Sequence, residues 1–173
     1  MGASAEESNR VRLVVSDTGP VLHLSEAQAL ELLALTGEAH VPKAVHTEIA
    51  YHRRDWQTPD WMTVDTLTAS YEDEAIAWQQ AGLLDIGEAE AIALARQINA
   101  QWLLTDDAAA RLFAQTIGLE VHGSLGIVLW AAAMKYLGRT EAEATLNRLA
   151  QSSLWVSARV LAQAKAALDQ LFS

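Results

Sequence analysis

The chain has 173 residues, of which 51% are hydrophobic, and its 22 acidic and 12 basic residues give a formal net charge of −10. The polar, acidic N-terminus predicts a short flexible arm over residues 1–10, and the length predicts a single folded domain over residues 11–173. The absence of cysteine excludes disulfides, a thiol nucleophile, thiolate zinc sites and iron–sulfur clusters. The longest apolar runs reach only about half of the ~20 residues that a membrane span needs, and residues 1–9 lack the pattern of a signal peptide. We therefore expect a cytoplasmic protein with no membrane association.

Short β-branched runs bounded by turn residues alternate along the chain with stretches whose apolar residues recur every three or four positions. The expected strands are residues 12–16, 40–41, 62–67, 101–105 and 119–122. The expected helices are residues 21–35, 43–51, 71–81, 88–99, 107–118 and 123–137, followed by two helices within residues 140–172, with Ser157 as a cap of the second. This alternation predicts an α/β fold with a mostly parallel central sheet flanked by helices.

Three aspartates follow two of the expected strands. Asp17 comes directly after the strand at 12–16, and Asp106 and Asp107 come directly after the strand at 101–105. Ligands of open α/β sheets bind at the carboxyl ends of the strands. If these two strands are neighbours, which chain order alone does not decide, the three carboxylates share one crevice.

Two glutamates occupy apolar helix faces. Glu88 shares a face with Ala91 and Ile92, whereas Glu90 lies about 200° away at ~100° per residue. Glu48 is flanked in the same way on its own helix. Capping of a helix N-terminus is the alternative explanation for Glu88, because a carboxylate in the first turn is favoured by the helix dipole.

Several carboxylates that converge on one edge suggest a divalent cation, because burying them together without one is costly. A site made only of oxygen ligands suits Mg²⁺ or Mn²⁺ rather than zinc. Such an ion lowers the pKa of a bound water and neutralises charge on a phosphodiester. The pattern therefore points to metal-assisted hydrolysis.

Other active-site patterns fit less well. The tripeptide Asp17-Thr18-Gly19 matches an aspartic-protease signature, but that site needs a β-rich body that this chain lacks. A phosphatase or phosphotransferase with Asp17 as nucleophile stays open, although Gly19 stands where such enzymes carry a second aspartate. The chain contains no Gly-rich phosphate loop of a common type, and its five histidines lack zinc-hydrolase spacing.

Aromatic and basic residues give weaker indications. The six tryptophans are scattered, so we expect them in the core or in a partner interface rather than stacked on bases. Residues 52–54, His-Arg-Arg, form the one compact basic cluster, for which a solvated loop and a phosphate contact are both open. Arg111 lies four residues after Asp107, at the spacing of a helical ion pair.

Taken together, four stretches resemble the PIN domain, the nuclease fold of the VapC-type toxins of bacterial toxin–antitoxin pairs. They are VVSDTGPVLHLS, VPKAVHTEIA, GEAEAIALA and LLTDDAAARLFAQTIGLEVHGSLGIV, and they cover most of residues 11–130 in the order that the family shows. The C-terminal helices fit a PIN subgroup known only as an uncharacterised nucleic-acid-binding family. The resemblance implies a three-layer PIN-like domain over residues 11–173.

The resemblance also implies a catalytic set made of Asp17, Glu48, Glu88, Asp106 and Asp107. In it, Asp17 corresponds to the first metal-binding aspartate, Glu48 to the glutamate of the next block, and Glu88 to an acidic residue that is Asp in many PIN domains. The last metal ligand falls on Asp106, which the spacing from Glu88 favours, or on Asp107, which the usual Thr-x-Asp pattern favours. The implied metal ligands are therefore Asp17, Glu88 and one or both of these aspartates.

The implied function is that of an endoribonuclease dependent on Mg²⁺ or Mn²⁺ that cleaves RNA, as the toxin of a toxin–antitoxin pair. The implied partner is a small antitoxin whose C-terminal segment covers the acidic crevice, and we also expect a homodimer. A PIN-like module that binds a partner without catalysis remains an alternative. The net charge of −10 is unusual for an RNA-binding protein, although nine arginines against three lysines suit local phosphate contacts.

Overall fold

A central parallel sheet organises the computed structural model, which describes residues 11–173; the arm expected over residues 1–10 lies outside this range. Its strands are β1 (Leu13–Ser16), β2 (Glu38–Pro42), β3 (Met62–Asp65), β4 (Trp102–Leu104) and β5 (Val121–His122). They are ordered β3-β2-β1-β4-β5, and every pair is parallel. The expected parallel sheet is therefore confirmed.

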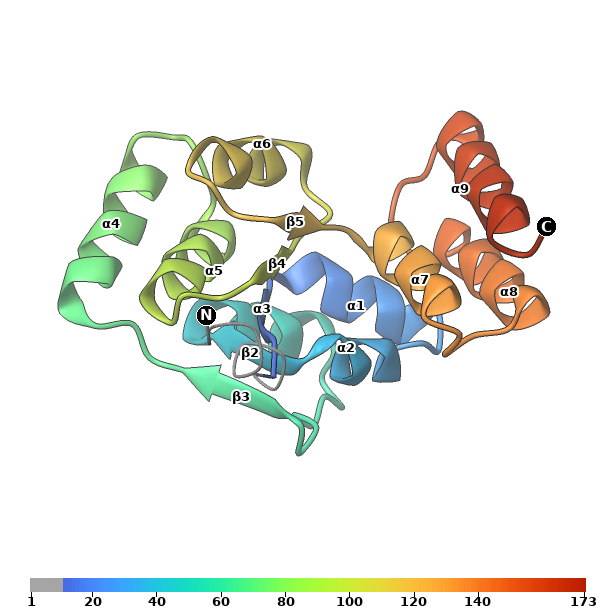
Figure 1. Ribbon diagram of the computed structural model, residues 1–173. Helices are drawn as coiled ribbons and strands as arrows, with labels where there is room; N and C mark the ends of the chain where they lie inside the picture. Colours follow the sequence, from blue (N-terminus) through green and yellow to red (C-terminus); the bar gives the residue numbers. More distant parts are fainter. Residues whose placement is uncertain (1–10) are drawn as a thin grey trace, which may run out of the picture.

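Nine helices flank this sheet within residues 11–173 and make the architecture three-layered α/β (Figure 1). They are α1 (Thr18–Glu26), α2 (Glu31–Thr36), α3 (Lys43–His52), α4 (Ala69–Gln80), α5 (Ile86–Gln97), α6 (Ala108–Thr116), α7 (Ser124–Ala133), α8 (Arg139–Ala150) and α9 (Ala158–Leu171). None of these described helices combines the length and the apolar character needed to cross a bilayer.

The central position of β1 brings the two halves of the chain together. Val14 and Val15 have no exposed surface, and β1 pairs with β2 on one side and β4 on the other. Val15 lies opposite both His40 of β2 and Leu103 of β4. Because β1 and β4 are parallel neighbours, the residues that follow them, Asp17 among them, emerge at the same edge of the sheet.

The helix expected over residues 21–35 is divided into α1 and α2. Gln28 adopts a left-handed backbone conformation (φ 58°), which an α-helix cannot contain. The Nε of Arg148 donates a hydrogen bond to the carbonyl of Ala27 at 2.7 Å and satisfies a backbone oxygen at this break. Apolar periodicity did not reveal the break because both segments bury leucines, and α2 turns away to pack on β2 and α7.

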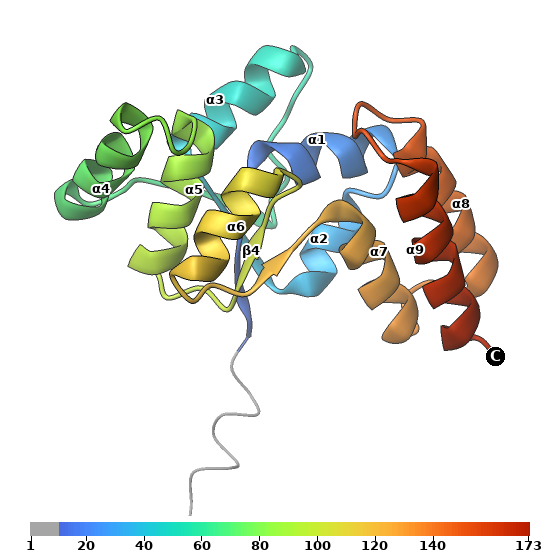
Figure 2. The same cartoon turned by 90° about the horizontal axis from the view of Figure 1, so that it is seen from above.

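The C-terminal helices α7, α8 and α9 pack on one another at one end of the molecule, next to α1 (Figures 1 and 2). Ser157 caps α9 as expected, because its Oγ accepts a hydrogen bond from the Val160 backbone NH. The α8–α9 loop, residues 151–157, is fastened to α1: the Ser153 backbone NH donates to Glu26 at 2.6 Å and the Ser153 hydroxyl at 2.7 Å. This attachment places the loop over the carboxyl edge of the sheet.

Candidate active site

A cavity of about 400 Å³ opens at the carboxyl edge of the sheet. Acidic side chains from four parts of the chain line it: the end of β1, helix α3, the start of α5 and the segment after β4. They are Asp17, Glu48, Asp85, Glu88, Asp106 and Asp107. The five residues proposed from the sequence therefore share one cavity, together with Asp85.

Asp17 is the most buried of these carboxylates, with 7% of its surface exposed. It caps the N-terminus of α1, since its Oδ1 accepts a hydrogen bond from the Thr18 NH at 2.8 Å, and its Oδ2 accepts one from the Thr105 hydroxyl at 3.0 Å. Burial raises the pKa of Asp17 from 3.8 to about 6 against these two bonds, and the charges of Asp85 and Glu48 add to the rise. Ionised Asp17 is thus short of compensating positive charge.

Glu48 is held between two neighbouring elements. The Thr18 hydroxyl donates to its Oε2 at 2.5 Å. On the other side, a Cβ placed on Gly87 of α5 would lie 2.5 Å from its Oε1, so glycine at position 87 leaves the space that the Glu48 carboxylate occupies. The carboxylate of Glu48 is therefore fixed in orientation at the wall of the cavity.

Glu88 serves as a cap and also lines the cavity. Asp85 and Glu88 form a capping box, in which the Glu88 NH donates to Asp85 at 2.8 Å and the Asp85 NH donates to Glu88 at 3.0 Å. Burial raises the pKa of Glu88 from 4.5 to about 7, and the charges of Asp85, Asp107 and Asp17 contribute. Glu90, expected on another face, is absent from this cavity and accepts a hydrogen bond from the Ala44 NH.

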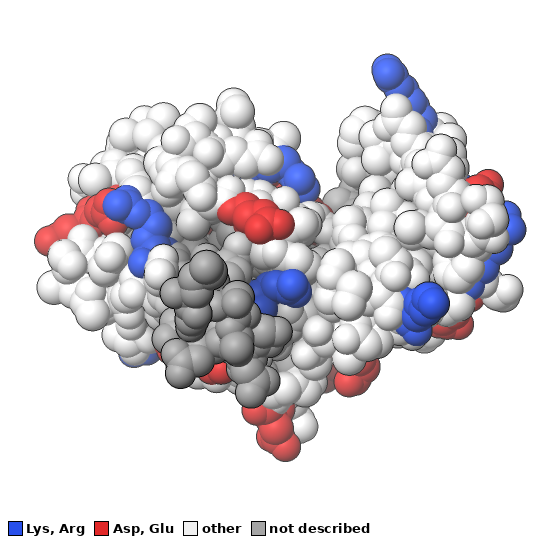
Figure 3. Space-filling view, in the orientation of Figure 1, with Lys and Arg blue, Asp and Glu red and all other residues white. Residues whose placement is uncertain are grey.

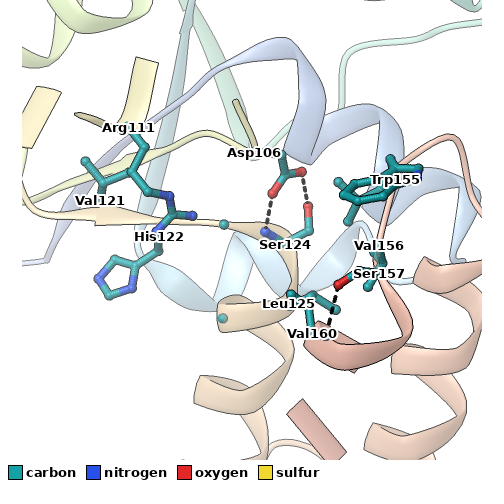
Figure 4. A pocket seen from close by; sticks show the side chains of 13 residues that line it. Asp106, Arg111, Val121, His122, Ser124, Leu125, Trp155, Val156, Ser157 and Val160 are labelled. Atoms are coloured by element: carbon teal, nitrogen blue, oxygen red, sulfur yellow. Dashed lines mark hydrogen bonds between the residues drawn. The ribbon is translucent and has the colours of Figure 1, made fainter. Parts of the chain in front are cut away.

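Asp106 is anchored by its own neighbours. The Ser124 NH and hydroxyl donate to its two oxygens at 2.7 and 2.5 Å (Figure 4), and the Nδ1 of His23 lies 2.7 Å from its Oδ2. Burial acts to raise the pKa of Asp106, but the hydrogen bonds from His23 and Ser124 outweigh it and lower the pKa. Asp106 therefore joins the end of β4 to α1 and α7.

Asp107 is more accessible. It is exposed and caps α6, with its Oδ1 accepting a hydrogen bond from the Ala110 NH at 2.8 Å. Its other carboxylate oxygen has no hydrogen-bond partner within residues 11–173. Of the two adjacent aspartates, Asp107 thus has the greater freedom to bind a ligand.

The spacing of Arg111 and Asp107 predicts an ion pair between them, and this prediction is wrong. Within the described chain Arg111 forms no ion pair; its Nη2 lies 3.4 Å from the carbonyl oxygen of Thr105. A Cβ placed on Gly123 would lie 2.6 Å from the same Nη2, so the guanidinium packs over the glycine that precedes α7. The helical spacing was correct, but the capping role of Asp107 turns its carboxylate toward the helix N-terminus.

The acidic cavity supplies only oxygen and imidazole donors. In the side-chain positions of residues 11–173, no three such donors converge closely enough to enclose a metal ion. The donors do not converge because Glu88 and Asp106 each accept a hydrogen bond from a backbone NH, Glu88 from Asp85 and Asp106 from Ser124. The donor chemistry nonetheless fits Mg²⁺ or Mn²⁺, and the raised pKa values of Asp17 and Glu88 indicate carboxylates that a cation would stabilise.

The face of the molecule seen in Figure 3 carries scattered charges of both signs and no broad basic patch. The basic cluster at residues 52–54 does not line the acidic cavity, and its Arg53 is engaged by Ser25 and, at 3.8 Å, by Asp55. Positive charge next to the cavity is thus confined to individual arginines.

Sequence reasoning did not select four residues that shape this site. Asp85 could have been found from the Asp-x-x-Glu capping pattern that it forms with Glu88. His23 and Ser124 gave no comparable signal, since each acts through a contact with an aspartate on another element, whereas Thr105 is the threonine of the Thr-x-Asp pattern but meets Asp17 only once β1 and β4 have paired.

A comparison with protein families decides the classification of this fold. A family model described as PIN domain matches residues 13–170, almost all of the described chain. The chain belongs to the PIN-domain family. No curated protein matches it. Membership explains the parallel sheet with acidic residues at its carboxyl edge, because the PIN domain is a nuclease-like fold whose members generally hydrolyse nucleic acid.

Proposed function

We propose that this PIN domain is an endoribonuclease that hydrolyses RNA phosphodiester bonds with Mg²⁺ or Mn²⁺. One observation carries the proposal: carboxylates from four separate elements line one cavity of about 400 Å³, and the pKa of Asp17 is raised to about 6. Helix capping alone does not require carboxylates where burial disfavours their ionisation, because Ser, Thr or Asn caps a helix without a charge. A divalent cation bound among them would offset that cost.

The contacts support a proposed role for each of the five acidic residues selected from the sequence. Asp17, Glu88 and Asp107 would hold the metal, since Asp17 and Glu88 have raised pKa values and Asp107 retains an oxygen without a partner in the described chain. Asp106, which the sequence left as an equal choice, orients the end of β4 through Ser124 and His23. Glu48, fixed by Thr18, would add negative charge at the wall of the cavity and help to position the metal and its water. When bound, the ion supplies a water of lowered pKa and positive charge opposite the phosphodiester.

The finer biological assignment rests on the resemblance of the motifs. We propose that the protein is a VapC-like toxin, that a small antitoxin covers the acidic cavity and that two copies form a homodimer. Induced expression should then arrest growth, and co-expression of the antitoxin should restore it. Expression of Asp17→Asn should have no effect, whereas growth arrest by this variant would contradict a toxic ribonuclease activity.

A phosphatase with Asp17 as nucleophile is less consistent with the contacts. Both oxygens of Asp17 accept hydrogen bonds, and a pKa of about 6 leaves the carboxylate less available than a freely ionised one. Beryllofluoride, which mimics an acyl phosphate, distinguishes the two reactions. Formation of a stable adduct on Asp17 would support the phosphatase and contradict our proposal.

The direct test is cleavage of a broad panel of RNAs by the purified chain with added Mn²⁺. The matched variants are Asp17→Asn and Asp73→Asn; Asp73 is an exposed aspartate of α4 that lies outside the cavity. We expect cleavage by the wild type and by Asp73→Asn and a loss of at least about 100-fold in Asp17→Asn, as the loss of an activated water implies. Sequencing the 5′ ends of cellular RNA after induction identifies the target. Binding of Mn²⁺ without cleavage of any RNA would instead indicate an inactive PIN-like module.

A further inference from the structure

Trp155 stands out among the described aromatic residues because 86% of its surface is exposed. It belongs to the α8–α9 loop and lines two cavities, the acidic cavity and a second one of about 290 Å³. The second cavity lies between the β5–α7 junction and the start of α9, and Asp106 also borders both. Trp155 therefore stands at the boundary between the candidate active site and an adjoining pocket.

The loop is anchored next to this residue. Ser153, two residues before Trp155, is bound to Glu26 of α1 by its NH and its hydroxyl, and the Ser152 hydroxyl donates to the carbonyl of Leu149 at 2.6 Å. Burial acts to raise the pKa of Glu26, but the hydrogen bonds from Ser153 outweigh it and lower the pKa, so the anchor is ionised at neutral pH. An exposed aromatic ring on an anchored loop costs little conformational entropy when it binds a ligand.

The second cavity combines an aromatic wall with a positive charge. Figure 4 shows Trp155 on one side of the Asp106–Ser124 pair and Arg111 on the other. The guanidinium of Arg111 has no carboxylate partner within residues 11–173, so it can pair with a phosphate. A volume near 300 Å³ is at the lower end of the range for small-molecule pockets.

We propose that Trp155 stacks on an unpaired base of the RNA substrate while the adjoining phosphodiester lies in the acidic cavity and Arg111 faces a neighbouring phosphate. The substrate class is then single-stranded RNA, because only an unpaired base exposes its face to an aromatic ring. This inference rests on the proposed ribonuclease function. A stacked base would also add affinity beyond the phosphate contacts, which matters for a chain with a net charge of −10. The exposure of Trp155 rules out a place in the core, and the proposal gives it the base-stacking role that its scattered position in the sequence did not favour.

The first test measures RNA binding without cleavage. Fluorescence anisotropy in EDTA follows a labelled single strand of about 12 nucleotides, a length within known single-strand site sizes, and the same sequence as a duplex. Trp155→Ala should weaken binding of the single strand about tenfold or more and leave duplex binding unchanged. Trp155→Phe should retain most of the affinity. The matched control is Tyr51→Ala, because Tyr51 is also 81% exposed but lines neither cavity.

The second test locates the stacked base. A set of single-stranded RNAs carries one abasic site each, at a different position. At one position the abasic site should weaken binding by the wild type but should not weaken binding by Trp155→Ala, relative to the intact RNA. That combination supports the stack, because the two changes remove the same contact. Equal losses in both proteins, or wild-type binding by Trp155→Ala, would overturn the proposal and leave the exposed ring to a protein partner.

The two proposals fail in different ways. If the wild type cleaves no RNA, the ribonuclease function fails, and binding in EDTA still decides whether Trp155 contacts a base. If cleavage occurs but Trp155→Ala has an unchanged KM, the stacking proposal fails while the ribonuclease function stands. Support for both is cleavage with a KM raised about tenfold or more in Trp155→Ala and a normal KM in Tyr51→Ala.

Discussion

The hydroxyl of Thr105 lies 3.0 Å from Oδ2 of Asp17, although 88 residues separate them in the chain. The same hydroxyl oxygen accepts a hydrogen bond from the Asp107 NH at 3.2 Å. One buried threonine at the end of β4 therefore links two carboxylates of the acidic cavity. Because β1 pairs with β4, the residues that follow these strands lie close enough for Thr105 to bond to Asp17.

Asp17→Asn should change stability in a pH-dependent manner. Folded Asp17 has a pKa of about 6 against an ordinary 3.8, so the folded protein binds more protons between these values. The free energy of unfolding consequently falls as pH rises from about 4 to about 6, by at most about 3 kcal/mol. Asparagine does not titrate, so the variant does not lose stability in this pH range, although the weaker hydrogen bond with Thr105 costs it about 1 kcal/mol at every pH. Denaturation in EDTA should show Asp17→Asn gaining stability relative to wild type between pH 4 and 7.

The same variant tests metal binding. Added Mn²⁺ should raise the melting temperature of the wild type, because a ligand that binds only the folded state stabilises it. The rise should be much smaller in Asp17→Asn and unchanged in Asp73→Asn. An equal rise in all three proteins would show that Mn²⁺ binds elsewhere.

Asp106 and Asp107 should respond differently to substitution by Asn. Asp106→Asn disturbs three hydrogen bonds of a largely buried carboxylate, so the free energy of unfolding should fall by about 2 kcal/mol. Asp107→Asn keeps a good helix cap and should cost less than about 0.5 kcal/mol, but it should abolish most of the Mn²⁺ shift. Urea denaturation and metal titration measure these effects. If Asp106→Asn abolished the Mn²⁺-induced rise in melting temperature and Asp107→Asn kept it, Asp106 would be the metal ligand instead.

Gly87→Ala should impair cleavage without unfolding the protein. The added methyl would lie 2.5 Å from Oε1 of Glu48, and the side chain of Glu48 can rotate away at the expense of its bond from Thr18. We expect stability within about 1 kcal/mol of wild type, because alanine is the better helix former, and at least about tenfold slower cleavage. Gly138→Ala is the matched control, since the methyl that it would add meets no neighbouring side chain within 4 Å and Gly138 lines neither cavity.

Arg12 should matter for stability alone. Its guanidinium lies 3.8 Å from the ring centroid of Trp102 and donates to the Thr36 carbonyl at 2.9 Å, at the edge of the sheet opposite the acidic cavity. Arg12→Ala should cost about 1–2 kcal/mol and leave cleavage unchanged. Arg159→Ala, at an exposed position of α9 with no ion pair in the described chain, should change neither property. A cleavage defect in Arg12→Ala would contradict the separation of the two edges.

Much of this architecture follows from local patterns in the sequence. The buried run that ends at Asp17 and the caps at Ser157 and Asp85 depend on neighbouring residues, and such patterns predict strands and helix ends well. The break at Gln28 is a Schellman-type end of α1, in which the NH groups of Gln28 and Ala29 bond to the carbonyls of Ser25 and Leu24, but glutamine occupies the left-handed position that glycine usually takes, so the residue type gave no stop signal. Arg111 shows the same limit, because helical spacing predicts its reach but not the competition for Asp107.

The candidate site divides in the same way. Residue type and position identified the carboxylates at the strand ends, because parallel strands share an edge. The difference between Asp106 and Asp107 depends on Ser124 and His23, whose approach requires the folded chain. The exposure of Trp155 is likewise a property of an anchored loop, and composition alone favours burial for tryptophan.

The strand order has a consequence for synthesis of the protein. Because β4 lies beside β1, a chain that is still growing on the ribosome has only one edge of β1 paired until residues 102–107 emerge. Asp17, Glu48 and Glu88 are then already made, but Thr105 and Asp107 are not, so the nascent protein holds no complete acidic cavity. A pairing between residues so distant in the chain also forms slowly. Under the proposed ribonuclease function, activity would therefore arise only after β4 has paired with β1, late in the synthesis of the chain.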